Sequence, residues 1–133
     1  TLDGTLFPYT TLFRSVLDLQ DFLERVQDDR ELLFELLEIF QADFANKRLV
    51  IPQLAKENKS QDIRDLAHSM KGAAGNISAK AIFATCLRME KNADNDDLSS
   101  IDKDLVLLDQ QFAELREFVV QLKANPKKFF PAG

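Results

Sequence analysis

The sequence predicts an all-α protein, an antiparallel up-down four-helix bundle preceded by a short extra N-terminal helix. Apolar residues recur every three or four positions along several long stretches, as in helices that bury one face. No stretch alternates apolar and polar residues as a strand does, and the chain holds only 4 Gly and 4 Pro. Its 133 residues suffice for one hydrophobic core and are too few for two ordinary domains.

Residues 1–15 differ in character from the rest and show no helical periodicity. Within them, residues 5–15 resemble the in-frame translation of a sequencing-adapter oligonucleotide, TLFPYTTLFRS. The segment is therefore either a non-native leader, which would replace the true upstream sequence, or an ordinary linker. It lacks the basic region and continuous apolar stretch of a signal peptide. We expect a leader at 1–15, the bundle at 16–124 and a C-terminal tail at 125–133.

Two helices are expected in the first part of the bundle. Asp18 suits the N-cap of a short helix, which the polar run 27–29 interrupts. A long helix follows from about Arg30, with an apolar face formed by Leu33, Leu37, Phe40, Phe44, Ile51 and Leu54 and widened by Leu32, Leu36 and Ile39. A face this wide predicts packing against more than one neighbour. Pro52 predicts a kink, or a restart of the helix near Val50.

The next predicted helix holds the only histidine of the chain, His68. Its core stripe is Ile63, Leu66, Ala67, Met70, Ala74 and Ile77. His68 lies well off this stripe, so its imidazole is predicted to be exposed. Its helical neighbours are Arg64, Lys71, Gly72 and Gly75. The two cations suit a bound anion. Each glycine costs about 1 kcal/mol relative to alanine in a helix, which indicates a need for bare backbone beside His68.

The ends of this helix and the start of the next are predicted from capping residues. Ser60 is the expected N-cap of the His68 helix, and the Gly75-Asn76 pair its end. Ser78 is expected to cap the following helix, whose apolar stripe is Ala79, Ile82, Phe83, Cys86 and Leu87. The acidic run 92–97 that follows lacks the glycine and the terminal glutamate of an EF-hand, so we interpret it as a solvated loop.

The last helix carries a seam of apolar residues at alternating spacings of four and three, namely Ile101, Leu105, Leu108, Phe112, Leu115, Val119 and Leu122. Such a seam is compatible with a coiled-coil dimer. Three other amphipathic helices also need partners, so it is more simply the inner face of the bundle. Phe129 and Phe130 in the tail either pack back onto the bundle or bind a partner.

Composition limits the possible functions. The formal net charge of −5 argues against nucleic acid as the main partner. The single cysteine, Cys86, excludes an internal disulfide and favours a reducing, cytoplasmic setting. No apolar run approaches the roughly eighteen residues that a membrane span needs.

The stretch beginning at His68 resembles the signature H-x-x-K-G-[AS]-[AS] of histidine-containing phosphotransfer (HPt) domains. Its residues are His68, Ser69, Met70, Lys71, Gly72, Ala73 and Ala74. With the flanking helical patterns the resemblance extends over residues 17–122. One position departs from the family pattern: Ser78 stands where the family usually has glycine.

The resemblance implies a phosphocarrier of multistep two-component phosphorelays rather than an enzyme with its own nucleotide site. His68 would be the phosphorylated nucleophile, Lys71 would stabilise phosphoryl charge, and Gly72 would leave access for the partner. Arg64 and Gly75 are weaker candidates for these two roles. The expected partners are response-regulator receiver domains, with a bacterial hybrid sensor histidine kinase as a fused or separate upstream protein. No cofactor or metal of the chain's own is expected, because Mg²⁺ would be bound by the receiver.

Other functions are less well supported. A non-catalytic helical interaction or dimerisation module, with His68 as a plain surface residue, is the main alternative. In the dimerisation domain of a sensor kinase the histidine normally precedes an acidic residue, whereas Ser69 follows His68 here. A metal-dependent enzyme is a distant third, since one His and one Cys without ligand spacing make a poor metal site.

Overall fold

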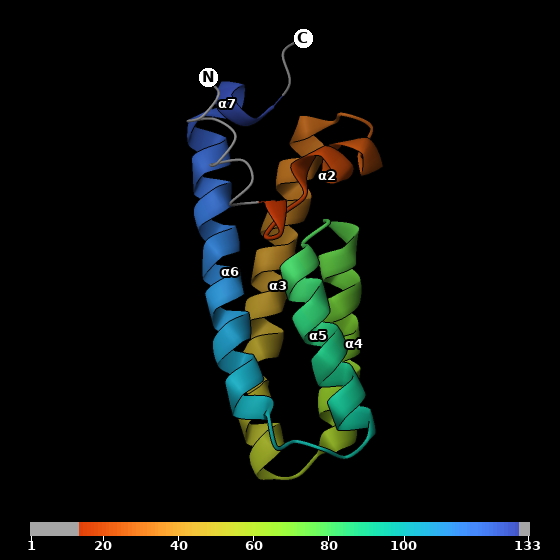
Figure 1. Cartoon of the computed structure of the whole chain (residues 1–133). Coiled ribbons are helices and arrows are strands. Elements are labelled where there is room, and N and C mark those ends of the chain that lie inside the picture. Colours follow the sequence, from red (N-terminus) through yellow and green to blue (C-terminus); the bar gives the residue numbers. More distant parts are fainter. Residues whose placement is uncertain (1–13, 131–133) are drawn as a thin grey trace.

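Four helices running alternately up and down form the body of this computed structural model, which describes residues 14–130 (Figure 1). They are α3 (Arg30–Lys56), α4 (Ser60–Asn76), α5 (Lys80–Asp94) and α6 (Ile101–Ala124). The short helices α2 (Leu19–Arg25) and α7 (Pro126–Phe129) lie at the same end of the bundle. The all-α, up-down bundle with a short extra N-terminal helix is thereby confirmed. The leader predicted at 1–15 falls almost entirely outside the described residues.

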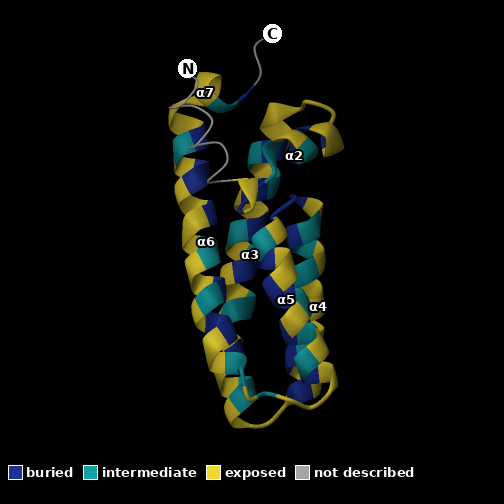
Figure 2. Cartoon of the chain, viewed as in Figure 1, coloured by how far each residue is buried: buried dark blue, intermediate teal, exposed yellow. Residues whose placement is uncertain are grey.

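The core lies between the four helices, where the buried positions turn inward (Figure 2). On α3 the buried side chains are Leu33, Leu37, Phe40, Phe44 and Ile51. The long helix contacts α2, α4 and α6, so the prediction of several neighbours is confirmed. Two of the residues expected to widen its apolar face are exposed instead, Leu32 at 38% and Ile39 at 63%. The neighbouring helices pack on both flanks of the stripe and leave these two side chains in solvent.

Helix α3 continues through Pro52, so of the two predicted alternatives the restart near Val50 is wrong, and the kink stays a prediction. Proline lacks the N–H that would complete one backbone hydrogen bond, and its ring crowds the carbonyl of the residue four positions earlier. The neighbouring Ile51 is fully buried. Packing of this last part of the helix against the core therefore keeps the segment helical despite the lost bond.

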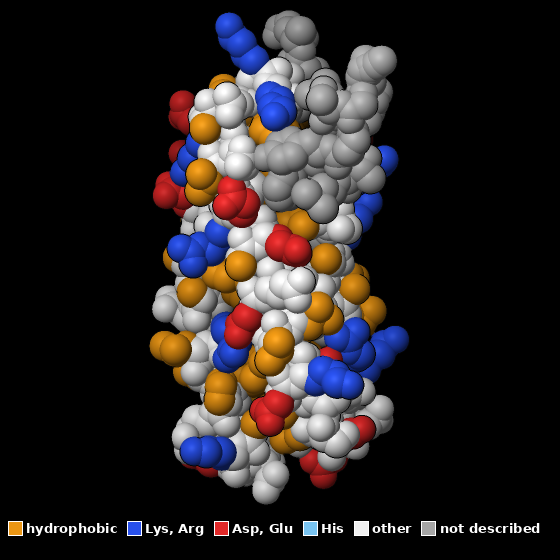
Figure 3. All heavy atoms as spheres, turned by 60° about the vertical axis from the view of Figure 1, so that its left-hand side comes forward, with side chains coloured by type: hydrophobic (Ala, Val, Ile, Leu, Met, Phe, Trp, Pro, Cys, Tyr) orange, Lys and Arg blue, Asp and Glu red, His pale blue; other side chains and the backbone are white. Residues whose placement is uncertain are grey.

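Helix α6 presents its predicted seam to the core. Leu105, Leu108, Leu115, Val119 and Leu122 are buried, and Ile101 and Phe112 pack against them. Figure 3 shows the side of the bundle on which α6 lies. Basic, acidic and hydrophobic side chains are interspersed on this surface, with no patch of one charge. After α6 the chain folds back, because Phe130 is buried against Phe34 and Phe129 lies edge-on to Phe118. The tail phenylalanines thus belong to the core.

The polar residues expected at two helix starts have other roles. Lys59 is the N-cap of α4, and Ser60 is already helical, with its hydroxyl donating to Asp96 at 2.6 Å. Ala79 is the N-cap of α5, and Ser78 adopts a left-handed conformation with φ 62°. Both predicted serine caps are therefore wrong. In each case the side chain found a partner on a distant segment, which for Ser78 is Asp21 of α2.

The left-handed conformation of Ser78 explains why glycine is the usual residue at this position in the family that the sequence resembles. A residue with a Cβ atom pays a steric cost there that glycine does not. The hydroxyl of Ser78 offsets part of that cost by donating to Asp21, and its backbone carbonyl accepts the N–H of Asp18, as that of any residue could. The turn between α4 and α5 is thereby tied to α2. Within residues 14–130 no helix is both long and apolar enough to cross a membrane.

Candidate functional site

His68 lies midway along α4 with 65% of its side chain exposed. Its neighbours Ala67 and Met70 are buried in the core. The helical rotation of about 100° per residue therefore turns the imidazole away from the core, as the sequence pattern predicted. The exposure of the only histidine is confirmed.

The imidazole is held by a carboxylate from the adjacent helix. His68 Nδ1 lies 2.6 Å from Glu90 Oε2, and Lys71 Nζ donates to the other oxygen, Oε1, at 2.6 Å. Glu90 is on α5, which packs along α4, and only 15% of its side chain is exposed. One carboxylate thus joins the two residues that the sequence singled out.

Glu90 is ionised at neutral pH. The hydrogen bond from Lys71 is the main reason that its pKa lies below the ordinary value; partial desolvation opposes this effect, and the bond to His68 adds to it. An ionised carboxylate can only accept hydrogen bonds. Nδ1 of His68 must therefore carry the proton.

The hydrogen bond of Nδ1 determines what the other ring nitrogen can do. In a neutral imidazole with a proton on Nδ1, Nε2 holds the free lone pair. Within the part of the chain that the structure describes, no hydrogen bond involves Nε2, and the ring is largely exposed. The arrangement presents an oriented nitrogen nucleophile to an incoming partner.

Arg64 is on the same side of α4 but is turned to other partners. Its guanidinium pairs with Asp65 at 2.9 Å and with Asp94 of α5 at 3.1 Å. It is 41% exposed, and neither pair includes Glu90. The structure therefore joins His68 and Lys71 directly through Glu90, whereas Arg64 belongs to a separate ion-pair group one turn away.

The two glycines beside His68 differ in their surroundings. A Cβ atom on Gly72 would meet open space, so this position leaves the outer face of α4 bare. A Cβ atom on Gly75 would lie 3.4 Å from the ring of Phe83 on α5. This is an ordinary van der Waals distance, so the packing of Phe83 does not by itself require glycine at position 75, and the access role of Gly75 stays a prediction. Phe83 itself is 37% exposed, although the sequence placed it in the core stripe.

Sequence reasoning missed Glu90. It is 22 residues from His68, and only the packing of α5 on α4 brings the two together. A signal was present, however, because Glu90 is the only acidic residue between Asp65 and Asp94. It is the one carboxylate that this stretch of the two helices could offer to Lys71.

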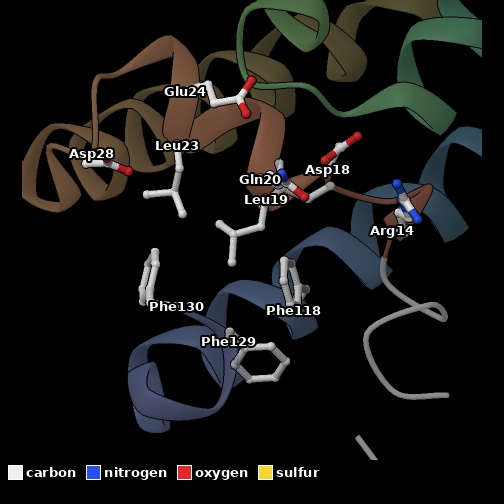
Figure 4. A pocket seen from close by; sticks show the side chains of 11 residues that line it. Arg14, Asp18, Leu19, Gln20, Leu23, Glu24, Asp28, Phe118, Phe129 and Phe130 are labelled. Atoms are coloured by element: carbon white, nitrogen blue, oxygen red, sulfur yellow. The ribbon is translucent and has the colours of Figure 1, made fainter. Parts of the chain in front are cut away.

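The cleft between α2, α6 and α7 is not near this site. It has a volume of about 610 Å³, and Leu19, Leu23, Phe118, Phe129 and Phe130 face one another across it (Figure 4). None of its lining residues is a predicted site residue, and none is a histidine or cysteine. Nor do residues 14–130 contain a group of three potential metal ligands from His, Cys, Asp or Glu.

Comparison with known proteins identifies the family. The sequence model of the Hpt domain family matches residues 19–124, which is most of the chain. The chain belongs to the Hpt domain family. Hpt domains are phosphotransfer modules of phosphorelays, and response-regulator receiver domains are their partners.

A solved structure supports the fold of this Hpt domain. The present chain is similar to the crystal structure of histidine-containing phosphotransfer protein B (HptB) from Pseudomonas aeruginosa PAO1, with a TM-score of 0.71 and 23% sequence identity. The match covers 83% of this chain and 96% of HptB. At this level of identity the similarity concerns the fold. A search of curated proteins gave no match.

Proposed function

We propose that this Hpt domain is a histidine phosphocarrier. It accepts a phosphoryl group on Nε2 of His68 from an aspartyl phosphate of a receiver domain and passes it to another receiver or back. The observation that most supports the proposal is the hydrogen bond between Nδ1 of His68 and Glu90, because it leaves the exposed Nε2 with the free lone pair.

In the proposed step, the lone pair of Nε2 attacks phosphorus and forms the N–P bond. The P–O bond to the receiver's aspartate breaks, and its electron pair stays on the aspartate carboxylate. Such transfers pass through a loose transition state, so positioning and charge stabilisation supply most of the catalysis. Glu90 and the closely packed α4–α5 pair supply the positioning on the side of the carrier.

Lys71 supplies charge stabilisation in this proposal. It lies one helical turn from His68 and is 20% exposed. In the resting protein its charge is balanced by Glu90. The phosphoryl oxygens would offer it a second anionic partner beside the imidazole. Gly72, where a Cβ atom would meet only open space, leaves the outer face of α4 free for the receiver's loops to approach His68.

The receiver would contribute the remaining chemistry. We propose that it brings the Mg²⁺ and its acidic ligands, and that this chain contributes no cofactor and no nucleotide site of its own. We further propose a cytoplasmic setting, with the phosphoryl group coming from a fused or separate hybrid sensor kinase. The free thiol of Cys86, buried in the core, suits a reducing compartment.

Intact-protein mass spectrometry tests the proposal. The protein is incubated with a panel of phosphorylated receiver domains, and the His68→Gln variant is treated in parallel. A single acid-labile phosphoryl adduct on the wild type, absent from the variant, is the expected result. An adduct of equal size on the variant, or none on the wild type with any active receiver, would reject the proposal and favour a non-catalytic interaction module.

A further inference from the structure

Glu90 contacts both His68 and Lys71, the two residues to which the proposed phosphocarrier function assigns chemistry. We infer that the Glu90 carboxylate keeps the proton on Nδ1 of His68 after the phosphoryl group has been taken up, so that phosphohistidine stays a ready donor. This inference rests on the proposed function and assigns a positioning residue to the same site.

The location of Glu90 suits that role. Its two oxygens are each engaged, one by Lys71 and one by His68, at 2.6 Å. The carboxylate is 15% exposed, at the boundary between two packed helices, so solvent screens its charge less than it would that of a free surface residue. Because Lys71 fixes the first oxygen, the second stays directed at Nδ1.

The chemistry of transfer gives this contact its importance. When Nε2 forms its bond to phosphorus while Nδ1 keeps its proton, the ring becomes a phosphoryl-imidazolium cation. A negative charge beside Nδ1 stabilises that cation, which favours retention of the proton. A neutral amide in the same place would accept the hydrogen bond and leave the positive charge unbalanced.

Retention of the proton decides how readily the phosphoryl group leaves. In the donor step the N–P bond breaks and its electron pair returns to Nε2, while the receiver's aspartate oxygen forms the new bond to phosphorus. If Nδ1 still holds its proton, the leaving group is neutral imidazole. If Nδ1 has lost the proton, the leaving group is the far more basic imidazolate, and transfer is slow.

Other charged or titratable groups surround this part of α4. The groups on α4 are Arg64, Asp65 and Lys71, and those on α5 are Glu90, Asp94 and the buried thiol of Cys86, whose pKa burial and the charge of Glu90 raise. Those on α3 are Asp43 and Lys47, which donates to Ser69. Asp65 and Asp94 both pair with Arg64, and Lys47 pairs with Asp43 of its own helix. Glu90 is the carboxylate in direct contact with the imidazole, so its charge has the largest effect on the Nδ1 proton.

The Glu90→Gln variant tests the inference, since glutamine keeps the size and an acceptor oxygen but removes the charge. Wild type and variant are both loaded with phosphoramidate, which phosphorylates histidine without a receiver, and circular dichroism checks that both are folded. Transfer to an unphosphorylated receiver is then followed across a pH series. Glu114→Gln, which removes one exposed carboxylate on α6, is the matched control.

We expect the donor rate of Glu90→Gln to be close to that of the wild type near pH 6 and about ten-fold lower near pH 8, with a longer-lived phosphohistidine. Glu90→Asp, which keeps the charge, should recover part of the rate, and Glu114→Gln should follow the wild type. The same pH profile for Glu90→Gln and wild type would overturn the inference while leaving the phosphocarrier function intact. Failure of the wild type itself to form phosphohistidine would instead overturn the function, and the inference with it.

Discussion

Helix α5 takes part in two carboxylate-centred clusters, one on each side, and they differ in what they leave exposed. Towards α4, Glu90 binds Lys71 and the largely exposed imidazole of His68. Towards α6, the carboxylate of Asp104 is 4% exposed and accepts from Arg88 of α5.

The cluster around Asp104 is closed within the protein. Both contacts from Arg88 go to Oδ1, at 3.0 and 2.9 Å, and Ser100 donates to Oδ2 at 3.1 Å. Asn92 in turn donates to the hydroxyl of Ser100. Both oxygens of the buried Asp104 carboxylate therefore have partners within the protein, which ties α5 to the start of α6. The Glu90 cluster instead ends in an exposed ring nitrogen, so the same kind of pairing orients a group that can react.

The largest expected effect on phosphoryl transfer comes from replacing His68 of the Glu90 cluster. We predict that His68→Gln abolishes phosphoryl acceptance completely while the melting temperature changes little, because the side chain is 65% exposed and off the core stripe. Receiver-dependent phosphorylation and thermal unfolding of the same sample measure both effects. A substantial loss of stability would show that the imidazole serves the fold as much as the chemistry.

Removing the buried carboxylate should give the opposite pattern. Asp104→Ala is expected to cost about 2–3 kcal/mol of unfolding free energy, less than a fully buried ion pair because Arg88 is half exposed and can turn to water. Phosphoryl acceptance by His68 should be retained below the unfolding transition. Urea unfolding monitored by circular dichroism measures the change.

Asp109→Ala is the matched control for that experiment. Asp109 pairs with Arg48 of α3 through two contacts of 2.8 Å, but its side chain is 53% exposed. Its loss should cost less than about 1 kcal/mol, as for other solvent-exposed ion pairs. Equal costs for the two variants would contradict the view that burial makes the Asp104 cluster structural.

Lys71→Ala should have an intermediate effect, confined to the reactive cluster. We expect about a ten-fold slower acceptance of phosphoryl groups from a receiver, because one positive charge beside the transferred group is lost. Rapid-quench kinetics provide the rate, and Lys80→Ala, which removes another lysine of an ion pair, is the control. Rates that are equal in the two variants would remove Lys71 from the site.

Acid should weaken the Glu90 cluster by a small amount. The pKa of Glu90 is lowered from 4.5 in the folded state, chiefly by Lys71. Its pairing therefore stabilises the fold above that ordinary value and is lost as the pH falls through the lower, folded-state pKa. The difference in melting temperature between wild type and Glu90→Gln should accordingly shrink as the pH is lowered from about 6 to about 3. A difference that stays constant over this range would contradict the assignment.

The bundle and the exposure of His68 could be predicted from the sequence because both depend on helical periodicity alone. The seam of α6 and the stripe of α4 needed only the rotation per residue. The two serine caps were predicted wrongly because the rule for capping considers local backbone donors, whereas Ser60 and Ser78 bind Asp96 and Asp21 far along the chain.

The candidate site was predictable in part for the same reason. His68, Lys71 and Gly72 share one face of one helix, so their proximity follows from spacing. Glu90 depends on the register of α5 against α4, which the tertiary structure determines. The turn that fixes this register contains Ser78 in a left-handed conformation, a feature that the identity of the residue did not suggest.

The measurement that tests the central claim most directly is ¹⁵N–³¹P NMR of the phosphorylated, ¹⁵N-histidine-labelled protein. Because the chain has one histidine, each ring nitrogen gives an assignable signal. We predict that phosphorus couples to Nε2, and that Nδ1 keeps a proton with the shift of a strong hydrogen bond to Glu90. Coupling of phosphorus to Nδ1, or no coupling to the histidine at all, would contradict the account.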